Sequence, residues 1–223
     1  MMKILKFGGT SVGSPERIKN VANLINDGEQ KIVVLSAMSG TTNTLVEIAD
    51  YLRKRNPESA SSVINQLRTL YSKHIKTLFT DNNLLNSTAQ ILDEIFMHLH
   101  SFAGTTFNND AEKSILAQGE LMSTNMMTNY LKELGVNVCL LPALDYMKID
   151  ENGEPDTAYI NQHLHDLLNK HKGYDLYITQ GFICRNVNGG VDNLRRGGSD
   201  YTACLIGSSL RAEEIQIWTD IDG

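Results

Sequence analysis

The chain has 223 residues, and its 26 acidic and 20 basic residues leave a formal net charge of −6. With 41% hydrophobic residues, the composition is that of a globular protein and excludes a disordered or fibrous chain. The acidic balance argues against a nucleic-acid binder, which needs clustered Lys and Arg for its phosphate contacts. No apolar run approaches the roughly 20 residues of a membrane span, and the charged start at residues 1–6 does not resemble a signal peptide.

Apolar runs of strand length alternate with longer stretches of helical period. The expected strands lie at residues 3–7, 31–35, 136–141, 175–179 and 215–218. The expected helices lie at residues 15–27, 44–55, 59–79, 84–102, 111–134, 159–171 and 201–210. Several of the strands are apolar almost throughout, as in parallel sheets that helices cover on both faces. The alternation therefore predicts an α/β fold, a three-layer sandwich with a mainly parallel central sheet.

Two segments interrupt this alternation. Residues 58–102 have the pattern of two consecutive helices with a polar turn at residues 81–83, which predicts an inserted helical hairpin. Residues 186–193 follow a strand and contain Asn188-Gly189-Gly190, which predicts the tip of a β-hairpin. We find no internal repeat and no linker that divides the chain.

Local signals mark the first helix. Ser14 before Pro15 is typical of an N-cap followed by a first-turn proline, and Gly28 is expected to end the helix.

The three cysteines, Cys139, Cys184 and Cys204, are widely spaced in apolar or small-residue stretches. Their odd number and the lack of a CxxC pair argue against a disulfide framework and a zinc site. We therefore expect reduced thiols in the core of a cytoplasmic protein.

Five polar or glycine-rich segments fall where strands end or helices begin, which is where open α/β sheets bind ligands. The first, residues 6–11, places Lys6 before the glycine pair Gly8-Gly9. Glycines let the backbone approach an anion, and free amides at a helix start point toward it. Because the lysine precedes the glycines, the segment is not a Walker loop, and an ordinary turn is the alternative.

The second segment, residues 35–43, is rich in hydroxyl side chains that can bind a carboxylate or phosphate. For Thr41, Thr42 and Asn43 taken singly, helix capping is the favoured interpretation.

The third segment is Gln118-Gly119-Glu120, within a long helical pattern. A glycine in mid-helix costs about 1 kcal/mol relative to alanine, which suggests that another group approaches closely there. Glu120 can pair with an ammonium group, and a solvated glutamate on a helix face is the alternative.

The fourth segment runs from Arg195 to Asp200 and contains Arg196, Gly197, Gly198 and Ser199. Guanidinium groups recognise carboxylates and phosphates, whereas Ser199 or Asp200 can equally be a helix N-cap.

The fifth segment is Trp218-Thr219-Asp220, which can contact a nucleotide, with a turn at Asp222-Gly223 as the alternative. Positive groups with glycine amides suit a polyphosphate, and Asp200 and Asp220 suit an Mg²⁺ ion that bridges it. Together these groups supply what phosphoryl transfer requires.

In combination, the five segments resemble aspartokinase, an enzyme of the amino-acid kinase superfamily. They read KFGGTSVG at 6–13, LSAMSGTTN at 35–43, QGELMS at 118–123, RGGSDYTA at 196–203 and WTDIDG at 218–223. The resemblance implies the amino-acid kinase (carbamate kinase-like) fold. It also implies ATP-dependent phosphorylation of the L-aspartate β-carboxylate to 4-phospho-L-aspartate, the first step toward lysine, threonine and methionine.

The resemblance also implies residue roles. It assigns catalysis to Lys6 and Asp200, and ATP binding to Lys6, Gly8, Gly9, Thr219 and Asp220. It assigns aspartate binding to Ser36, Thr42, Glu120, Arg196, Gly197, Gly198 and Ser199, with Glu120 on the ammonium and Arg196 on a carboxylate. The expected cofactor is Mg²⁺ with ATP, without a metal site made by the protein alone. The expected partners are ATP, L-aspartate and further copies of the full-length protein, but neither nucleic acid nor membrane.

Two departures from the family stand out. Arg195 occupies a position where the family usually has glycine. The family also continues beyond residue 223, commonly into regulatory ACT domains, so we expect residues 1–223 to be a catalytic domain truncated at its C-terminus. Residues 141–147 and 154–156 look more like the kinase portion of bifunctional aspartokinase/homoserine dehydrogenases.

Two other functions stay open on the sequence. One is a different amino-acid kinase, such as a glutamate, acetylglutamate or uridylate kinase. The other is a non-catalytic fragment that binds a nucleotide or an amino acid and is inactive by itself.

Overall fold

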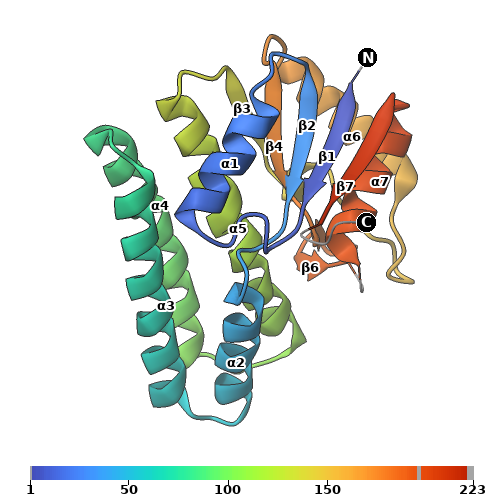
Figure 1. Cartoon of the computed structure of the whole chain (residues 1–223). Coiled ribbons are helices and arrows are strands. Elements are labelled where there is room, and N and C mark those ends of the chain that lie inside the picture. Colours follow the sequence, from blue (N-terminus) through green and yellow to red (C-terminus); the bar gives the residue numbers. More distant parts are fainter. Residues whose placement is uncertain (1, 195–196, 220–223) are drawn as a thin grey trace.

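The computed structural model describes residues 2–194 and 197–219. Its centre is a sheet of five parallel strands in the order β3-β4-β2-β1-β7, with helices on both faces (Figure 1). The strands are β1 (Lys3–Phe7), β2 (Lys31–Leu35), β3 (Val138–Leu141), β4 (Leu176–Gln180) and β7 (Glu214–Trp218). A separate antiparallel pair is formed by β5 (Ile183–Arg185) and β6 (Val191–Asn193). The predicted three-layer α/β fold is confirmed.

The two faces of the sheet carry separate apolar cores, because successive side chains of a strand point to opposite faces. Leu5 and Val33 belong to the core beneath α1 and α5, whereas Ile4 and Ile32 belong to the core beneath α6 and α7. The flanking helices are α1 (Pro15–Ile25), α5 (Asn109–Glu133), α6 (Thr157–Lys170) and α7 (Gly198–Leu210). The short 3-10 helices are η1 (Phe102–Gly104) and η2 (Ala143–Asp145).

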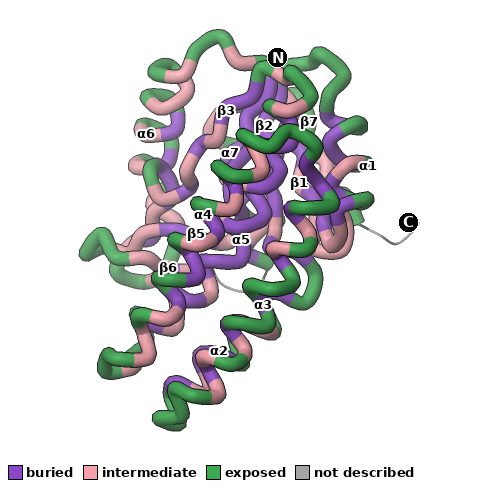
Figure 2. The backbone as a smooth tube through the Cα atoms, turned by 90° about the vertical axis from the view of Figure 1, so that its left-hand side faces the viewer, coloured by how far each residue is buried: buried purple, intermediate pink, exposed green. Residues whose placement is uncertain are grey.

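Three more helices extend the first core beyond the carboxyl ends of the strands (Figure 1). They are α2 (Thr41–Arg53), α3 (Pro57–Leu78) and α4 (Asn82–Ser101). Ile64, Tyr71 and Phe96 are fully buried between them and are continuous with the apolar layer on the sheet. Figure 2 shows exposed residues along the outer sides of these helices and buried residues toward the sheet.

The capping predictions succeeded in part. The Ser14 side chain accepts a hydrogen bond from the Arg17 amide, as expected of an N-cap, but α1 already ends at Ile25, ahead of Gly28. The capping role considered for Thr41, Thr42 and Asn43 is wrong. Helix α2 begins at Thr41 behind Gly40, whose φ of 84° is left-handed, and no side chain caps it.

The cysteine prediction is also only partly correct. Cys139 and Cys184 are buried, but Cys204 is exposed, and all three are free thiols. Within residues 2–194 and 197–219, no helix is long and apolar enough to cross a membrane.

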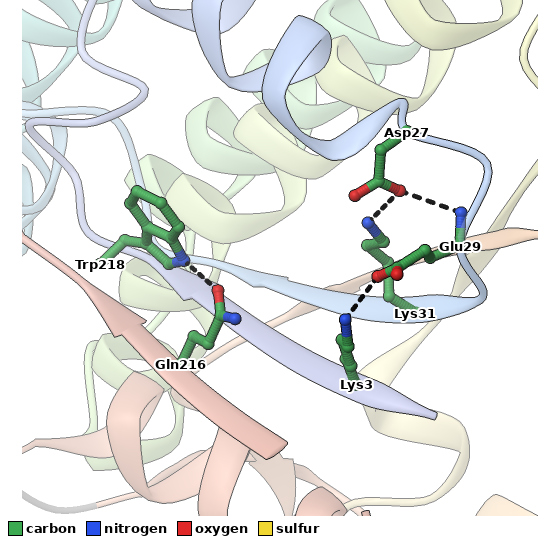
Figure 3. Close-up of polar contacts among 6 residues, drawn as sticks. All are labelled: Lys3, Asp27, Glu29, Lys31, Gln216 and Trp218. Carbon is green, nitrogen blue, oxygen red and sulfur yellow. Dashed lines mark hydrogen bonds and ion pairs between the residues drawn. The ribbon is translucent and has the colours of Figure 1, made fainter. Parts of the chain in front are cut away.

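The amino-terminal edge of the sheet carries charges that pair locally (Figure 3). Lys3 contacts Glu29 at 2.6 Å, and the buried Lys31 contacts Asp27, four residues earlier. Each of these lysines has its own carboxylate, so neither ammonium group is left for an anion at this end of the sheet.

The core between α2, α3 and α4 leads to a prediction about stability. Ile64 is fully buried in α3, whereas Leu70 of the same helix is 46% exposed. We expect Ile64→Ala to lower the free energy of unfolding by about 2–5 kcal/mol, because a cavity remains in a packed core. Leu70→Ala is the matched control and should change it by less than about 0.5 kcal/mol in urea titrations. Equal losses in both variants would contradict this description of the core.

Candidate active site

The carboxyl ends of four strands lie side by side. Phe7 of β1 is the register partner of Leu35 in β2 and of Trp218 in β7, and Leu35 is the partner of Gln180 in β4. The residues that follow these strands therefore open their loops along one edge of the sheet. The first, second and fifth segments singled out in the sequence begin at these strand ends. The fourth ends in the first turn of α7, and the third lies within α5.

Lys6 points toward the α7 side of the sheet. Its Nζ atom lies 2.7 Å from Oδ1 of Asp200, in the first turn of α7. A Cβ atom at Gly8 would lie 3.6 Å from the same Nζ, so the ammonium group sits over the bare backbone of that glycine. The Lys6 side chain is 12% exposed and that of Asp200 52%, so this ion pair stands at the rim of the site.

Gly9 connects the first loop to the loop after β2, residues 36–41, which we call the Ala37 loop. A Cβ atom at Gly9 would lie 2.6 Å from the Ala37 carbonyl oxygen, so no other residue fits there without a shift. The Ser39 amide donates a hydrogen bond of 3.0 Å to the Gly9 carbonyl. The loops after β1 and β2 therefore form one packed unit.

The Ala37 loop also contacts α5. The Ser123 hydroxyl donates to the Ser36 carbonyl at 2.8 Å, and the Ala37 amide donates to a carboxylate oxygen of Glu120 at 3.2 Å. A Cβ atom at Gly119 would lie 2.7 Å from Cβ of Ala37, which confirms the predicted close approach at this mid-helix glycine. Thr42 is exposed in the first turn of α2.

Glu120 is buried, with 5% of its surface exposed, so the alternative of a solvated helix-face glutamate is wrong. Burial raises the pKa of its carboxyl from the ordinary value near 4.5 to about 7, although the Ala37 amide opposes that rise. A buried carboxylate of this kind is stabilised by a cation that reaches it.

The start of α7 lies tightly against the end of β4. A Cβ atom at Gly181 would lie 2.5 Å from the Ser199 hydroxyl, and one at Gly198 would lie 2.8 Å from the Phe182 ring. The N-cap of α7 is Gly197, with a left-handed φ of 78° and no side-chain cap. The N-cap role considered for Ser199 and Asp200 is therefore wrong. Among the described residues no side chain caps the first amides of α7, which can bind an anion.

Thr219 directly follows β7, which pairs with β1 on the side away from β2. Trp218 stacks on Phe7, with ring centroids 5.6 Å apart. Thr219 and Trp218 line a cavity of about 360 Å³ together with Phe7, Ser11 and Arg17.

Two residues of the predicted site, Arg196 and Asp220, lie outside the described residues, as does Arg195, the departure from the family pattern. Within the part of the chain that the structure covers, no group of three or more His, Cys, Asp or Glu side chains could hold a metal ion. A carboxylate such as Asp200 beside the predicted anion-binding loop nevertheless fits Mg²⁺ that arrives on a polyphosphate, because Mg²⁺ takes few protein ligands there.

The structure adds residues that the sequence did not single out. Gly181 lies two residues after the predicted strand at 175–179 and directly after the observed β4, and the rule that selected Gly8 and Gly9 could have found it. Ser123 ends the QGELMS segment but had no role of its own, and Tyr71 stands in a helical pattern without a local signal. Their contacts with the Ala37 loop mark both residues.

Comparisons with known proteins agree with this geometry. The model of the amino acid kinase family matches residues 1–223. The chain is 31% identical over 224 residues to lysine-sensitive aspartokinase 3 of Escherichia coli K12, covering 99% of this chain and 49% of that protein. It is 30% identical over 241 residues to the bifunctional aspartokinase/homoserine dehydrogenase of Haemophilus influenzae, covering 100% of this chain and 28% of that protein.

A solved structure is similar in three dimensions. The crystal structure of E. coli aspartokinase III in complex with aspartate and ADP matches with a TM-score of 0.87 at 31% sequence identity. The match covers 100% of this chain and 50% of that one, so the chain spans about half the length of this relative.

The buried Glu120 generates a prediction about pH and stability. The unfolded chain releases the Glu120 proton near pH 4.5, whereas the folded chain retains it to about pH 7, so raising the pH between these values destabilises the fold. Glu120→Gln removes this contribution. We expect the variant to gain roughly 2 kcal/mol relative to the wild type between pH 5 and pH 8 without ligand. Urea unfolding at both pH values measures it, and a pH-independent difference would contradict the burial argument.

Proposed function

The chain belongs to the amino acid kinase family, and we propose that it transfers the γ-phosphate of ATP to the β-carboxylate of L-aspartate, forming 4-phospho-L-aspartate. The observation that carries the proposal is a pair of linked half-sites at one sheet edge. One holds the ammonium of Lys6 over Gly8 and beside Asp200, and the other holds the buried carboxyl of Glu120. E. coli aspartokinase III, with 31% identity to this chain, was solved with aspartate and ADP, which supports the same pair of ligands here.

Lys6, Gly8 and Gly9 would receive the phosphates of ATP. The attacking carboxylate is already ionised at neutral pH, because its ordinary pKa is about 3.9, so the reaction needs no general base. The main obstacle is repulsion between two anions, and the Lys6 ammonium offsets it at the point where charge develops. Asp200 would keep that ammonium at the strand end through the 2.7 Å contact.

The amino acid would lie between the Ala37 loop and the start of α7. Glu120 would bind its ammonium group, because a cation at this depth restores the charge balance of a buried carboxylate. Ser36 and Thr42 would line the same half-site. Gly197, Gly198 and Ser199 would face a substrate carboxylate together with Arg196, whose role rests on the family resemblance alone.

The nucleotide would extend toward Thr219 and Asp220, the latter again by family resemblance. Mg²⁺ bound to the phosphates supplies charge neutralisation, and Asp200 with Asp220 would be the carboxylates that face it.

We further propose that residues 1–223 form an aspartokinase catalytic domain, with residues 58–102 as a helical insertion that contains α3 from its second residue and the whole of α4. The free state of the three cysteines is compatible with a cytoplasmic enzyme. Such an enzyme would serve lysine, threonine and methionine synthesis, and would act as a homo-oligomer in its full-length form.

The first kinetic prediction concerns the ion pair. We expect Lys6→Ala and Asp200→Ala each to lower kcat by roughly 10²–10³-fold, because each change removes or releases the positive charge at the reacting phosphate. Trapping of the acyl phosphate with hydroxylamine measures the rate, and glutamate in place of aspartate tests the substrate. Lys3→Ala is the matched control, since Lys3 lies on the same strand but pairs with Glu29 at the opposite edge. Wild-type turnover in either site variant would reject the assigned roles.

The second kinetic prediction concerns pH. Aspartate must meet an ionised Glu120, so kcat/KM for aspartate should fall about tenfold per pH unit below the pKa of about 7. Glu120→Gln should lower kcat/KM and lose this acid limb. Glu112→Gln, on the same helix but paired with Arg53, should retain the wild-type profile. An acid limb that survives in Glu120→Gln would assign the titration to another group.

A further inference from the structure

Tyr71 ties the helical insertion to the edge of the site. It lies in α3 with 1% of its surface exposed, and its ring packs edge-on against Phe96 of α4 at a centroid distance of 6.2 Å. Its hydroxyl shares a hydrogen bond of 2.8 Å with Oγ1 of Thr41, the first residue of α2. A buried tyrosine hydroxyl needs such a partner, so the two residues hold each other in place.

Thr41 ends the Ala37 loop, whose other end carries the amide that contacts Glu120. The Thr41 amide donates to the Met38 carbonyl at 3.0 Å, which closes the loop on itself. The Thr41 methyl group would lie 3.4 Å from a Cβ atom at Gly119, next to Glu120 in α5. A displacement of Thr41 would therefore disturb the loop and the Glu120 turn of α5 together.

Among the described residues, few side chains hold the start of α2 at this end of the loop: the Thr44 hydroxyl donates to the Gly40 carbonyl at 3.1 Å, and Tyr71 contacts Thr41. The N-cap of α2 is Gly40, whose φ of 84° leaves it in the conformation that glycine enters freely, and no side chain caps the helix. An ordinary N-cap side chain would fix the helix start from within the loop. Here a hydroxyl from a different helix provides a contact at that point.

We propose that Tyr71 is a positioning residue for the amino-acid half of the site, and that its hydroxyl, through Thr41, holds the Ala37 loop beside Glu120, which receives the substrate ammonium. The inference rests on the proposed function and adds a residue from the helical insertion to it. Burial raises the pKa of Tyr71 above its ordinary range, so the hydroxyl stays neutral and serves as a hydrogen-bond partner rather than a base.

The test compares Tyr71→Phe, Thr41→Val and the double variant. Each single change removes one hydroxyl and keeps the shape, and each should raise KM for aspartate roughly three- to tenfold, with kcat and KM for ATP within about twofold. The double variant should match the single variants, because each single change already removes the hydrogen bond between Tyr71 and Thr41. Hydrogen exchange of the amides of residues 36–41 should accelerate in all three proteins.

The matched control is Tyr146→Phe. Tyr146 is also fully buried, and its hydroxyl shares a 2.8 Å hydrogen bond with Thr179, but in the opposite core. This variant should lose comparable thermal stability while leaving both KM for aspartate and exchange in the Ala37 loop unchanged.

The outcomes distinguish a failure of the positioning role from a failure of the proposed function. An unchanged KM for aspartate in Tyr71→Phe, or an equal rise in Tyr146→Phe, would overturn the positioning role. Unchanged exchange in residues 36–41 would overturn it as well. A third outcome is that the wild-type chain does not phosphorylate aspartate, while hydrogen exchange in residues 36–41 accelerates in Tyr71→Phe but not in Tyr146→Phe. In that case Tyr71 does hold the Ala37 loop, and the proposed substrate is wrong.

Discussion

Ala37 is wedged between two glycines, and the arrangement of the whole site depends on this contact. Because Gly9 and Gly119 have no side chains, they leave room for the Ala37 carbonyl on one side and for its methyl group on the other. A methyl group at either glycine would collide with Ala37, so the loop after β1, the loop after β2 and α5 could not close together. This steric constraint sets the distance between the glycine pair near Lys6 and the carboxyl of Glu120.

The two carboxylates of the site stand in contrasting surroundings. Asp200 is half exposed and meets Lys6 at the rim, where water and the ammonium both stabilise its charge. Glu120 is buried, and hydrogen bonds from the Ala37 amide and from its own amide do not offset the cost of burial, so a cation would stabilise its ionised form. The less stabilised of the two carboxylates, Glu120, therefore lies where a positively charged ligand would bind. Binding sites commonly differ in this way from structural ion pairs, whose charges are already compensated within the fold.

The helical insertion is part of the same physical unit as the site. Helices α3 and α4 lie outside the three layers of the sandwich, but their core is continuous with the apolar layer on the sheet. Through Tyr71 this core reaches Thr41 and so contributes to the position of the Ala37 loop. The α7 side is held differently, by the close contacts of Gly181 and Gly198, so the two halves of the site are fixed by separate parts of the fold.

The sequence alone determined the layered α/β architecture, the strands at residues 3–7 and 31–35, and the segments that meet at the sheet edge. These features follow from local periodicity and from glycines and charged residues next to strand ends, which are readable within a few positions. Only the tertiary structure decided that Glu120 is buried, that Cys204 is exposed, and that Tyr71 of a different helix contacts the start of α2. The physical reason is that burial and hydrogen-bond partners depend on residues tens of positions away, and the pattern around one residue carries no record of which distant element will cover it.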